Sequence, residues 1–337
     1  MKIGSPSIRQ RVGRLGHRLS LLWAQARARL ENSEVAIFHR FRLPPWGGGN
    51  QFLLALREEF ERRGLRVGGN VITSDTRACL FNSFNFDFDR LRCMNREGRR
   101  MVHRVDGPIG VYRGRDDGSD RRIWEINNEL ADATVFQSSY SLQRHAGLGL
   151  SFQSPVVIMN AANARIFYPD PARTGLSGGK VKLISTSWSD NPNKGAATYK
   201  WLEGHLDWDR FEYTFVGHSQ IRFERIRVLK PMSSRGLADL LRRSDIFITA
   251  SLHDPCSNSL IEAVSCGLPA IYARSGGHAE IVKEAGLGFS AVEEIPQLLE
   301  QLVDEYAVRR ARISVPSLAQ VADQYLAVMG IRSEVRG

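Results

Sequence analysis

Short apolar runs rich in β-branched residues alternate with longer amphipathic segments from residue 34 onward. An alternation of this kind is typical of βαβ units that build parallel sheets. In the first half of the chain, the pattern predicts strands at 35–39, 67–72, 78–81, 101–105, 133–137 and 155–159. It predicts helices at 51–63 and 122–130. These elements are sufficient for one α/β domain.

A second alternation follows segment 163–180, whose Pro, Gly and Ser residues predict a linker. The expected strands are 181–185, 211–216, 226–229, 246–250 and 269–272. The expected helices are 194–204, 234–243, 258–266, 281–284, 295–306 and 317–329. The simplest fold that accounts for this pattern is α/β with two doubly wound sheets. In such folds, ligands bind in the crevice outside the carboxyl ends of the strands.

The pattern divides the chain into four parts. We expect a basic amphipathic segment at 1–33, Rossmann-like domains at 34–165 and 166–312, and at 313–337 a helix that crosses back to the first domain. Residues 1–30 hold seven Lys or Arg and no acidic residue, with an apolar helical stripe formed by Leu15, Leu19, Leu22 and Trp23. This pattern is typical of a helix on an anionic membrane surface, but a helix packed on its own domain would look the same.

The formal net charge of +10 suits a partner such as nucleic acid, an anionic membrane or a phosphorylated substrate. The sequence has no signal peptide and no apolar run near the ~20 residues that a spanning helix needs. We therefore expect a cytoplasmic protein, peripheral to the inner face of the cell membrane if the first helix binds lipid. The four cysteines show no spacing typical of zinc or redox sites.

The stretch 254–270, DPCSNSLIEAVSCGLPA, follows an apolar strand and enters a helix. The start of that helix would present free N–H groups and a positive dipole end, which favour a phosphate. Asp254 would lie at the mouth of this site. Glu262, further along the helix, could accept hydrogen bonds from two vicinal hydroxyls, as a ribose presents. The residues expected at the helix N-terminus are Ser257, Asn258 and Ser259.

This stretch resembles the donor-binding signature of family 4 glycosyltransferases, which are retaining enzymes of the GT-B fold. The signature has an acidic residue, seven intervening residues, a glutamate and a Cys-Gly-Leu-Pro run, and a GGHAEIV run at 276–282 follows here. The resemblance spans about residues 35–310. It implies an acceptor domain followed by a nucleotide-sugar donor domain, with parallel sheets facing across a cleft. It also implies that Asp254 touches the donor sugar and Glu262 the nucleotide ribose.

Two further positions of the second domain match the family, and one departs from it. Lys194, beside Gly195, looks like the family's donor-phosphate lysine and could stabilise the leaving group as a point charge. His218 closes a Phe-Val-Gly-His run that resembles the turn near the nucleotide base. Ser189 stands where the family usually has an arginine, so Arg274 or an N-terminal arginine would have to substitute.

The first domain offers a glycine-rich turn and a polar strand end. Gly48, Gly49 and Asn50 belong to the run PWGGGN, where the family carries a loop near donor and acceptor, although any tight βα turn would use the same residues. The run MVHRVDG at 101–107 aligns Asp106 with a family histidine that faces the donor sugar. Asp106 could bind an acceptor hydroxyl and accept its proton. His103 is either a sugar contact or a satisfied core histidine.

We expect no metal and no cofactor other than a nucleotide-diphosphate sugar as co-substrate. Asp87-Phe88-Asp89 has the spacing by which another transferase fold holds a divalent ion, but it lies far before the donor signature. The resemblance implies that lysine and the helix dipole neutralise the diphosphate instead.

The expected activity is a metal-independent hexosyl transfer with retention, onto a saccharide or lipid-linked acceptor in polysaccharide or glycoconjugate assembly. The catalytic residues would be Asp106, Lys194 and Asp254. Two rivals stay open. One is a non-catalytic protein of the same fold that binds nucleic acid or anionic membrane, although the chain has no recognised nucleic-acid module. The other is a sugar-nucleotide epimerase.

Overall fold

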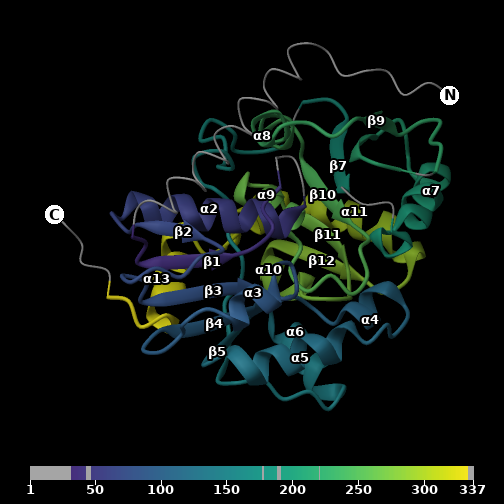
Figure 1. Cartoon of the computed structure of the whole chain (residues 1–337). Helices are drawn as coiled ribbons and strands as arrows, with labels where there is room; N and C mark the ends of the chain where they lie inside the picture. The colour runs from purple at the N-terminus through teal and green to yellow at the C-terminus, as the bar shows by residue number, and fades with distance from the viewer. Residues whose placement is uncertain (1–31, 43–46, 177, 188–190, 220, 333–337) are drawn as a thin grey trace, which may run out of the picture.

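The structure is a computed structural model that describes residues 32–42, 47–176, 178–187, 191–219 and 221–332. Two sheets of parallel strands lie in separate layers of the molecule, each with helices on its faces (Figure 1). The basic segment predicted at 1–33 falls almost wholly outside the described residues, and so does Ser189. None of the described helices is long and apolar enough to cross a membrane.

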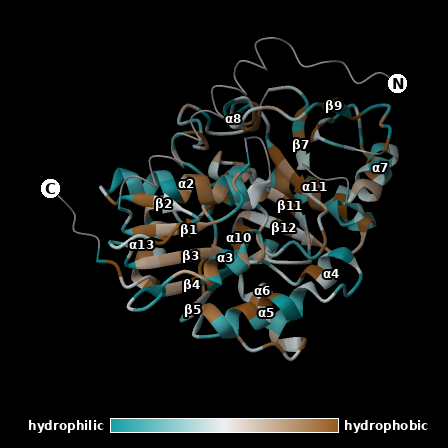
Figure 2. Cartoon of the chain, viewed as in Figure 1, coloured by the Kyte–Doolittle hydropathy of each residue, from teal (hydrophilic) through white to brown (hydrophobic). Residues whose placement is uncertain are grey.

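The first sheet has the strand order β2-β1-β3-β4-β5-β6, and every pairing in it is parallel. Its strands β1, β3, β4 and β5 are almost fully buried, as expected for a sheet covered on both faces, and β1 and β3 are coloured mostly as apolar in Figure 2. The strands are β1 (Val35–Phe38), β2 (Val67–Gly69), β3 (Ala78–Asn82), β4 (Arg100–Val105), β5 (Ala133–Phe136) and β6 (Pro155–Val157).

The second sheet has the order β12-β11-β10-β7-β8-β9 and is again wholly parallel. Strands β8 and β9 are added on one side of β7, and β10, β11 and β12 on the other side. The strand order therefore changes direction between β7 and β10, which makes this a topological switch point, where ligands commonly bind. The strands are β7 (Val181–Ser187), β8 (Phe211–Gly217), β9 (Arg227–Leu229), β10 (Ile246–Thr249), β11 (Ala270–Ala273) and β12 (Gly286–Phe289).

Helices connect the strands as the alternation predicts, but the structure adds short ones that the pattern did not indicate. Those of the first half are α2 (Gly48–Arg62), α3 (Phe88–Arg92), α4 (Ile109–Arg113), α5 (Ser119–Leu130) and α6 (Ser139–Gly147). Those of the second half are α7 (Ala196–His205), α8 (Ser234–Arg242), α9 (Asn258–Ser265), α10 (His278–Val282), α11 (Ile295–Asp304), α12 (Tyr306–Ala311) and α13 (Leu318–Val328). Single 3₁₀ turns are η1 (Pro192–Lys194), η2 (Lys283–Ala285) and η3 (Val292–Glu294).

The C-terminal helix α13 packs on the first sheet, far from its sequence neighbours. Its buried Tyr325 lies with its ring centroid 5.9 Å from that of Phe52 in α2. Arg63, just after α2, donates a hydrogen bond of 2.7 Å to the carbonyl of Ala319. Burial of this apolar seam stabilises the first domain with residues from the far end of the chain.

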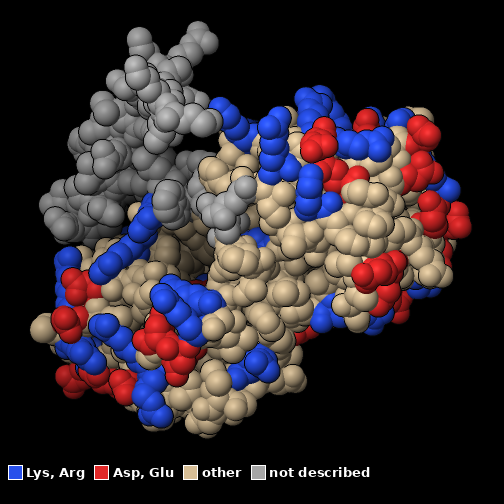
Figure 3. All heavy atoms as spheres, turned by 90° about the vertical axis from the view of Figure 1, so that its right-hand side faces the viewer, with Lys and Arg blue, Asp and Glu red and all other residues tan. Residues whose placement is uncertain are grey.

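The surface charge is mixed rather than segregated. On the face drawn in Figure 3, Lys and Arg side chains lie among Asp and Glu over both lobes of the described molecule. Since the first 30 residues alone hold seven Lys or Arg, much of the positive excess of the sequence comes from the segment that the structure does not describe.

Candidate active site

A cleft of about 710 Å³ lies between the two domains. Residues that follow the carboxyl ends of strands in both sheets line it, as the strand topology predicts. The first domain contributes the ends of β1, β3, β4 and β5, and the second contributes those of β7, β8 and β10. The polar side chains that meet in this cleft include Asn50, Asp106, Gln137, Lys194, Asp254 and Glu262.

The N-terminus of α9 forms one wall of the cleft. Ser257 caps this helix, because its hydroxyl accepts a hydrogen bond from the backbone N–H of Leu260. Ser257, Asn258 and Ser259 all line the cleft, so the positive end of the α9 dipole faces the cavity. The helix ends at Ser265 with Cys266 as its C-cap, and the next residue, Gly267, has a φ of 88°, the left-handed conformation that favours glycine.

Lys194 and Asp254 form an ion pair in the same wall, with Nζ and Oδ2 2.8 Å apart. They come together because η1 is fastened to the loop after β10, where the Leu252 N–H donates to the Asn193 carbonyl at 2.7 Å. Gly195 permits this approach, since a β-carbon there would collide with Ala250. Burial would raise the pKa of Asp254, but the nearby Lys194 ammonium outweighs burial and holds the pKa below its usual value.

The glycine pair after β11 holds the Asp254 loop. The Gly277 N–H donates to the Asp254 carbonyl at 2.9 Å, and Gly276, with φ of 68°, leaves no room for a β-carbon beside that carbonyl. The Cys256 N–H also donates to the Asp254 carboxylate at 3.2 Å. The GGHAEIV run therefore acts on the site by fixing the carboxylate rather than by lining the cleft.

Glu262 lines the cleft one turn into α9. Burial raises its pKa to about 8, and no hydrogen bond or ion pair of its carboxyl group is seen among the described residues. A carboxyl group in this state can accept hydrogen bonds from a ligand without first breaking a bond within the protein.

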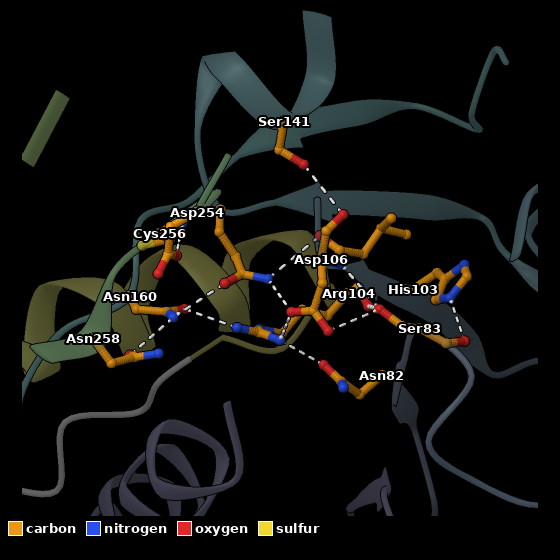
Figure 4. Close-up of polar contacts among 12 residues, drawn as sticks. Asn82, Ser83, His103, Arg104, Asp106, Ser141, Asn160, Asp254, Cys256 and Asn258 are labelled. Carbon is orange, nitrogen blue, oxygen red and sulfur yellow. Dashed lines mark hydrogen bonds and ion pairs between the residues drawn. The ribbon is translucent and has the colours of Figure 1, made fainter. Parts of the chain in front are cut away.

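The first-domain side of the cleft is built on Arg104, a fully buried arginine (Figure 4). Its guanidinium donates to Asn82 at 2.5 Å, to Asp106 at 3.0 Å and to Asn160 at 3.0 Å. Gln137 also donates to the Asp106 carboxylate. These donors define where the Asp106 carboxylate points.

Asp106 is a weak base as a result of this network. Burial would raise its pKa, but the Arg104 guanidinium and the hydrogen bonds from Gln137 and Ser83 outweigh burial and lower it. The expectation that Asp106 accepts a proton from the acceptor therefore needs revision. Its carboxylate is suited to bind and orient a hydroxyl, while its lowered pKa disfavours proton transfer to it.

Sequence reasoning gave no role to Arg104 or Asn160. Asn160 follows β6, is fully buried, and donates to Asn258 of α9 at 3.1 Å, so one side chain joins the Arg104 network to the second domain. The arginine inside the predicted strand 101–105 could have indicated this network, because a cation in a strand that is buried on both faces needs partners. The partners are 22 and 56 residues away and could not be identified from spacing.

Two of the predicted site residues do not line the cleft. His103 is fully buried in the first core, where its Nε2 bonds the Ser83 carbonyl at 3.0 Å, the Asn127 amide bonds its Nδ1 at 3.1 Å, and its ring is directed away from Asp106 (Figure 4). Because side chains alternate along a strand, the neighbour of Arg104 points to the opposite face. His103 is the satisfied core histidine, and the prediction of a sugar contact was wrong.

His218, predicted near the nucleotide base, stays a prediction. The strand β8 ends at Gly217, which lines the cleft, whereas the exposed His218 side chain lies outside the lining residues. Arg274, considered as a substitute for the family arginine, donates from Nε to the Gly288 carbonyl at 3.0 Å and is likewise absent from the cleft.

The glycine-rich turn is in fact the first turn of α2. Gly48 lies so close to Asn258 that a β-carbon on it would be 2.5 Å from the Asn258 amide nitrogen. Asn50 exchanges two hydrogen bonds with the backbone of Arg42, at 2.9 and 2.8 Å. The predicted helix at 51–63 began too late because the glycines were interpreted as loop, although tertiary packing favours them in the helix.

Asp87 of the D-x-D run is the N-cap of α3, and its carboxylate accepts from the Arg90 N–H at 3.0 Å. No group of three or more His, Cys, Asp or Glu side chains placed to hold a metal occurs among the described residues. Asp87 thus has a structural role.

Residues 223–310 match the family model described as glycosyl transferases group 1. No curated protein shows significant sequence similarity to the chain.

Solved structures match most of it. HepE from Anabaena, solved in complex with UDP, has a TM-score of 0.63 at 13% identity, over 88% of this chain and 99% of that one. The catalytic domain of Starch Synthase IV from Arabidopsis thaliana, solved bound to ADP and acarbose, has a TM-score of 0.66 at 12% identity, over 89% and 99%. AviGT4, a glycosyltransferase involved in Avilamycin A biosynthesis, has a TM-score of 0.57 at 14% identity, over 88% and 97%.

At such identities the likeness concerns the fold. Two six-stranded parallel sheets that face across a cleft agree with these neighbours, and the predicted GT-B architecture is confirmed. The chain therefore has the GT-B fold, and its residues 223–310 are similar to the glycosyl transferases group 1 family model.

Proposed function

We propose that the protein is a retaining glycosyltransferase that moves a hexose from a nucleotide-diphosphate sugar to a saccharide or lipid-linked saccharide. The observation that carries the proposal is the convergence in one cleft of Lys194, Asp254, Glu262 and the α9 N-terminus, opposite Asp106. The family match at 223–310 supports it, because this segment contains α9 and both acids of the second domain.

The donor would bind on the second-domain wall. The diphosphate would lie at the N-terminus of α9, with Lys194 as the cation, and the ribose hydroxyls would donate to Glu262. Solved neighbours hold related ligands, since HepE was crystallised with UDP-glucose and Starch Synthase IV with ADP. Asp254 would accept from a hydroxyl of the sugar, and its ion pair with Lys194 links recognition of the sugar to the charge on the diphosphate.

The acceptor would enter from the first domain, where Asp106 binds its hydroxyl. In the transfer step, the bond between the anomeric carbon and the diphosphate oxygen breaks and the electron pair leaves with the phosphate. The acceptor oxygen bonds to the anomeric carbon from the same face, and its proton passes to the departing phosphate oxygen. Lys194 and the α9 dipole stabilise the charge that develops on the leaving group.

We infer that these groups meet the diphosphate charge without a divalent metal. The support is that Lys194 and the N-terminus of α9 line the same cleft, where a point charge and a dipole would act on the same anion. Turnover that persists in a chelator would agree with this, and turnover restored only by Mg²⁺ or Mn²⁺ would contradict it.

Membrane association through residues 1–33 is a separate proposal based on charge alone. Seven Lys or Arg on an amphipathic segment would bind anionic vesicles in a salt-dependent way. Deleting residues 1–30 should abolish sedimentation with phosphatidylglycerol vesicles, and unchanged sedimentation would reject this part of the account.

The proposed reaction is tested by incubating the full chain with each of UDP-, GDP-, ADP- and dTDP-glucose and an acceptor panel. We expect a glycoside whose anomeric configuration, read by NMR, equals that of the donor. An inverted product would contradict retention. Isomerised sugar nucleotide without transfer would favour an epimerase.

A further inference from the structure

The first-domain side of the cleft carries more positive than negative charge. Its described lining includes Arg40, Arg42 and Arg113, whereas Asp106 is its one carboxylate. Asp106 is already compensated by Arg104 at 3.0 Å, and Arg113 is paired with Asp117 at 2.7 Å. Arg40, in contrast, is exposed and forms no ion pair with any described residue.

Arg40 stands at a boundary between two cavities. Arg40 also lines a second cavity, of about 170 Å³. The other residues that line this second cavity include Gly69, Asn70, Asp87 and Arg90. The carboxylate of Asp87 accepts from the Arg90 backbone N–H in its capping role. The Arg90 side chain is exposed and has no ion pair within the described part of the chain, so this second cavity holds two arginines against the single carboxylate of Asp87.

The backbone that carries Arg40 is held from both sides. The Arg40 N–H donates to the Asn85 carbonyl at 2.7 Å. The preceding residue, His39, donates from its N–H to the Asn70 side chain at 3.1 Å and accepts from it at 3.0 Å. Asn70 itself has φ of 56°, a conformation in which Asn is enriched. The backbone of Arg40 is therefore held in place between the two cavities.

His39 adds an unused polar atom at the same place. It lines the cleft and is 6% exposed, yet its buried Nδ1 has no hydrogen-bond partner among the described residues. A buried polar atom without a partner costs free energy. This nitrogen is enclosed by the protein, so the group that the end of β1 offers directly to a molecule in the cleft is the Arg40 cation.

We propose that the acceptor is an anionic saccharide chain. Its receiving hydroxyl lies at Asp106, its nearest carboxylate or phosphate group binds Arg40, and its next anionic group reaches Arg90. Arginine suits either group, since its planar guanidinium forms paired hydrogen bonds with carboxylate and phosphate alike. This inference rests on the proposed transfer reaction and assigns its acceptor class.

Three probes of the same length test the proposal with the full chain. Maltotetraose is neutral, tetragalacturonate carries carboxylates, and maltotetraose phosphorylated on its terminal 6-hydroxyl carries a phosphate. Titration calorimetry should show that at least one anionic probe binds at least about tenfold more tightly than maltotetraose, and less tightly as salt rises. The anionic probe that binds identifies the group, carboxylate or phosphate.

Arg40→Gln should weaken binding of that probe about tenfold, and Arg40→Gln with Arg90→Gln should weaken it further. Arg77→Gln is the matched control, because Arg77 is also exposed but precedes β3 at the opposite edge of the sheet and lines neither cavity. Equal affinities for neutral and anionic probes, no binding of either anionic probe, or equal losses in Arg40→Gln and Arg77→Gln would each overturn the proposal.

Thermal shifts with nucleotide sugars separate this outcome from failure of the transfer reaction. Arg40 lies on the first domain, whereas the donor is proposed to bind the second. Nucleotide sugars should therefore raise the melting temperature of Arg40→Gln as much as that of the unaltered protein. If no nucleotide sugar raises the melting temperature of either protein, the proposed transfer reaction is contradicted independently of the results with the saccharide probes.

Discussion

Gly48, at the start of α2, packs against Asn258, at the start of α9, so tightly that a β-carbon on Gly48 would lie 2.5 Å from the Asn258 amide nitrogen. The two helices belong to different domains, and both direct their N-termini at the cleft. A glycine is needed here for proximity rather than for backbone conformation. The cleft geometry therefore depends on the absence of one methyl group.

Gly48→Ala should lower turnover at least about tenfold, because moving the two helix ends apart by a few tenths of an ångström displaces the donor from the acceptor. The melting temperature should change little, since alanine favours a helix. Gly204→Ala, at a helical glycine with no atom within 4 Å of its added β-carbon, is the control and should keep full turnover. Equal turnover in both variants would remove Gly48 from the account.

Lys194→Ala should slow turnover by about 10² to 10³ while weakening donor binding much less, because the ammonium stabilises charge that develops as the diphosphate leaves. Lys182→Ala, on the same strand-loop unit but outside the cleft, serves as the control. The comparison needs kcat and the donor Kd separately. A loss confined to donor affinity would show that Lys194 binds the ground state and the transition state equally.

Glu262 makes stability of the donor-free protein depend on pH. Its pKa is raised from 4.5 to about 8, so between these values the folded protein holds a proton that the unfolded chain has released. Stability must then fall as pH rises through this window, by at most ~1.4 kcal/mol per pH unit.

Glu262→Gln removes that dependence. The gain in melting temperature of Glu262→Gln over the unaltered protein should therefore be larger at pH 8.5 than at pH 5, about the two ends of this window. Differential scanning calorimetry at both values checks this prediction. A constant difference would mean that the carboxyl group is not desolvated in the folded state.

Arg104→Ala should lower the free energy of unfolding by about 3–5 kcal/mol, because it removes a fully buried side chain and leaves the buried Asn82 and Asn160 amides without their donor. Arg92→Ala should cost less than about 1 kcal/mol, since that arginine forms an exposed pair with Glu129. Urea unfolding measures both. If both variants lose similarly little free energy of unfolding, water replaces the hydrogen bonds of Arg104 at little cost.

Much of the fold followed from sequence because apolar strands buried on both faces leave a clear pattern. The strands at 35–39, 101–105 and 246–250 were located within one or two residues of β1, β4 and β10. Short helices such as α4 and α6 were missed, since five to nine residues give little periodicity. The prediction of α2 failed at its start, where packing on Asn258 overrides the low helix propensity of glycine.

The candidate site was predictable where its residues are close in sequence. Asp254, Glu262 and the serines between them lie on one loop and one helix, so spacing alone placed them together. Arg104, Asn160 and Arg40 depend on contacts between distant segments. The contact predicted for His103 failed because its side chain points to the other face of the strand. Orientation of this kind is set by tertiary packing, which spacing does not encode.

The most direct test of the central claim is donor binding by the full chain, compared with that of Glu262→Ala. A thermal-shift panel of UDP-, GDP-, ADP- and dTDP-glucose should raise the melting temperature with one nucleotide, since a ligand that binds only the folded state stabilises it. Glu262→Ala should lose most of that shift. A panel with no shift, or a shift that Glu262→Ala keeps in full, would contradict the assignment of this cleft as a nucleotide-sugar site.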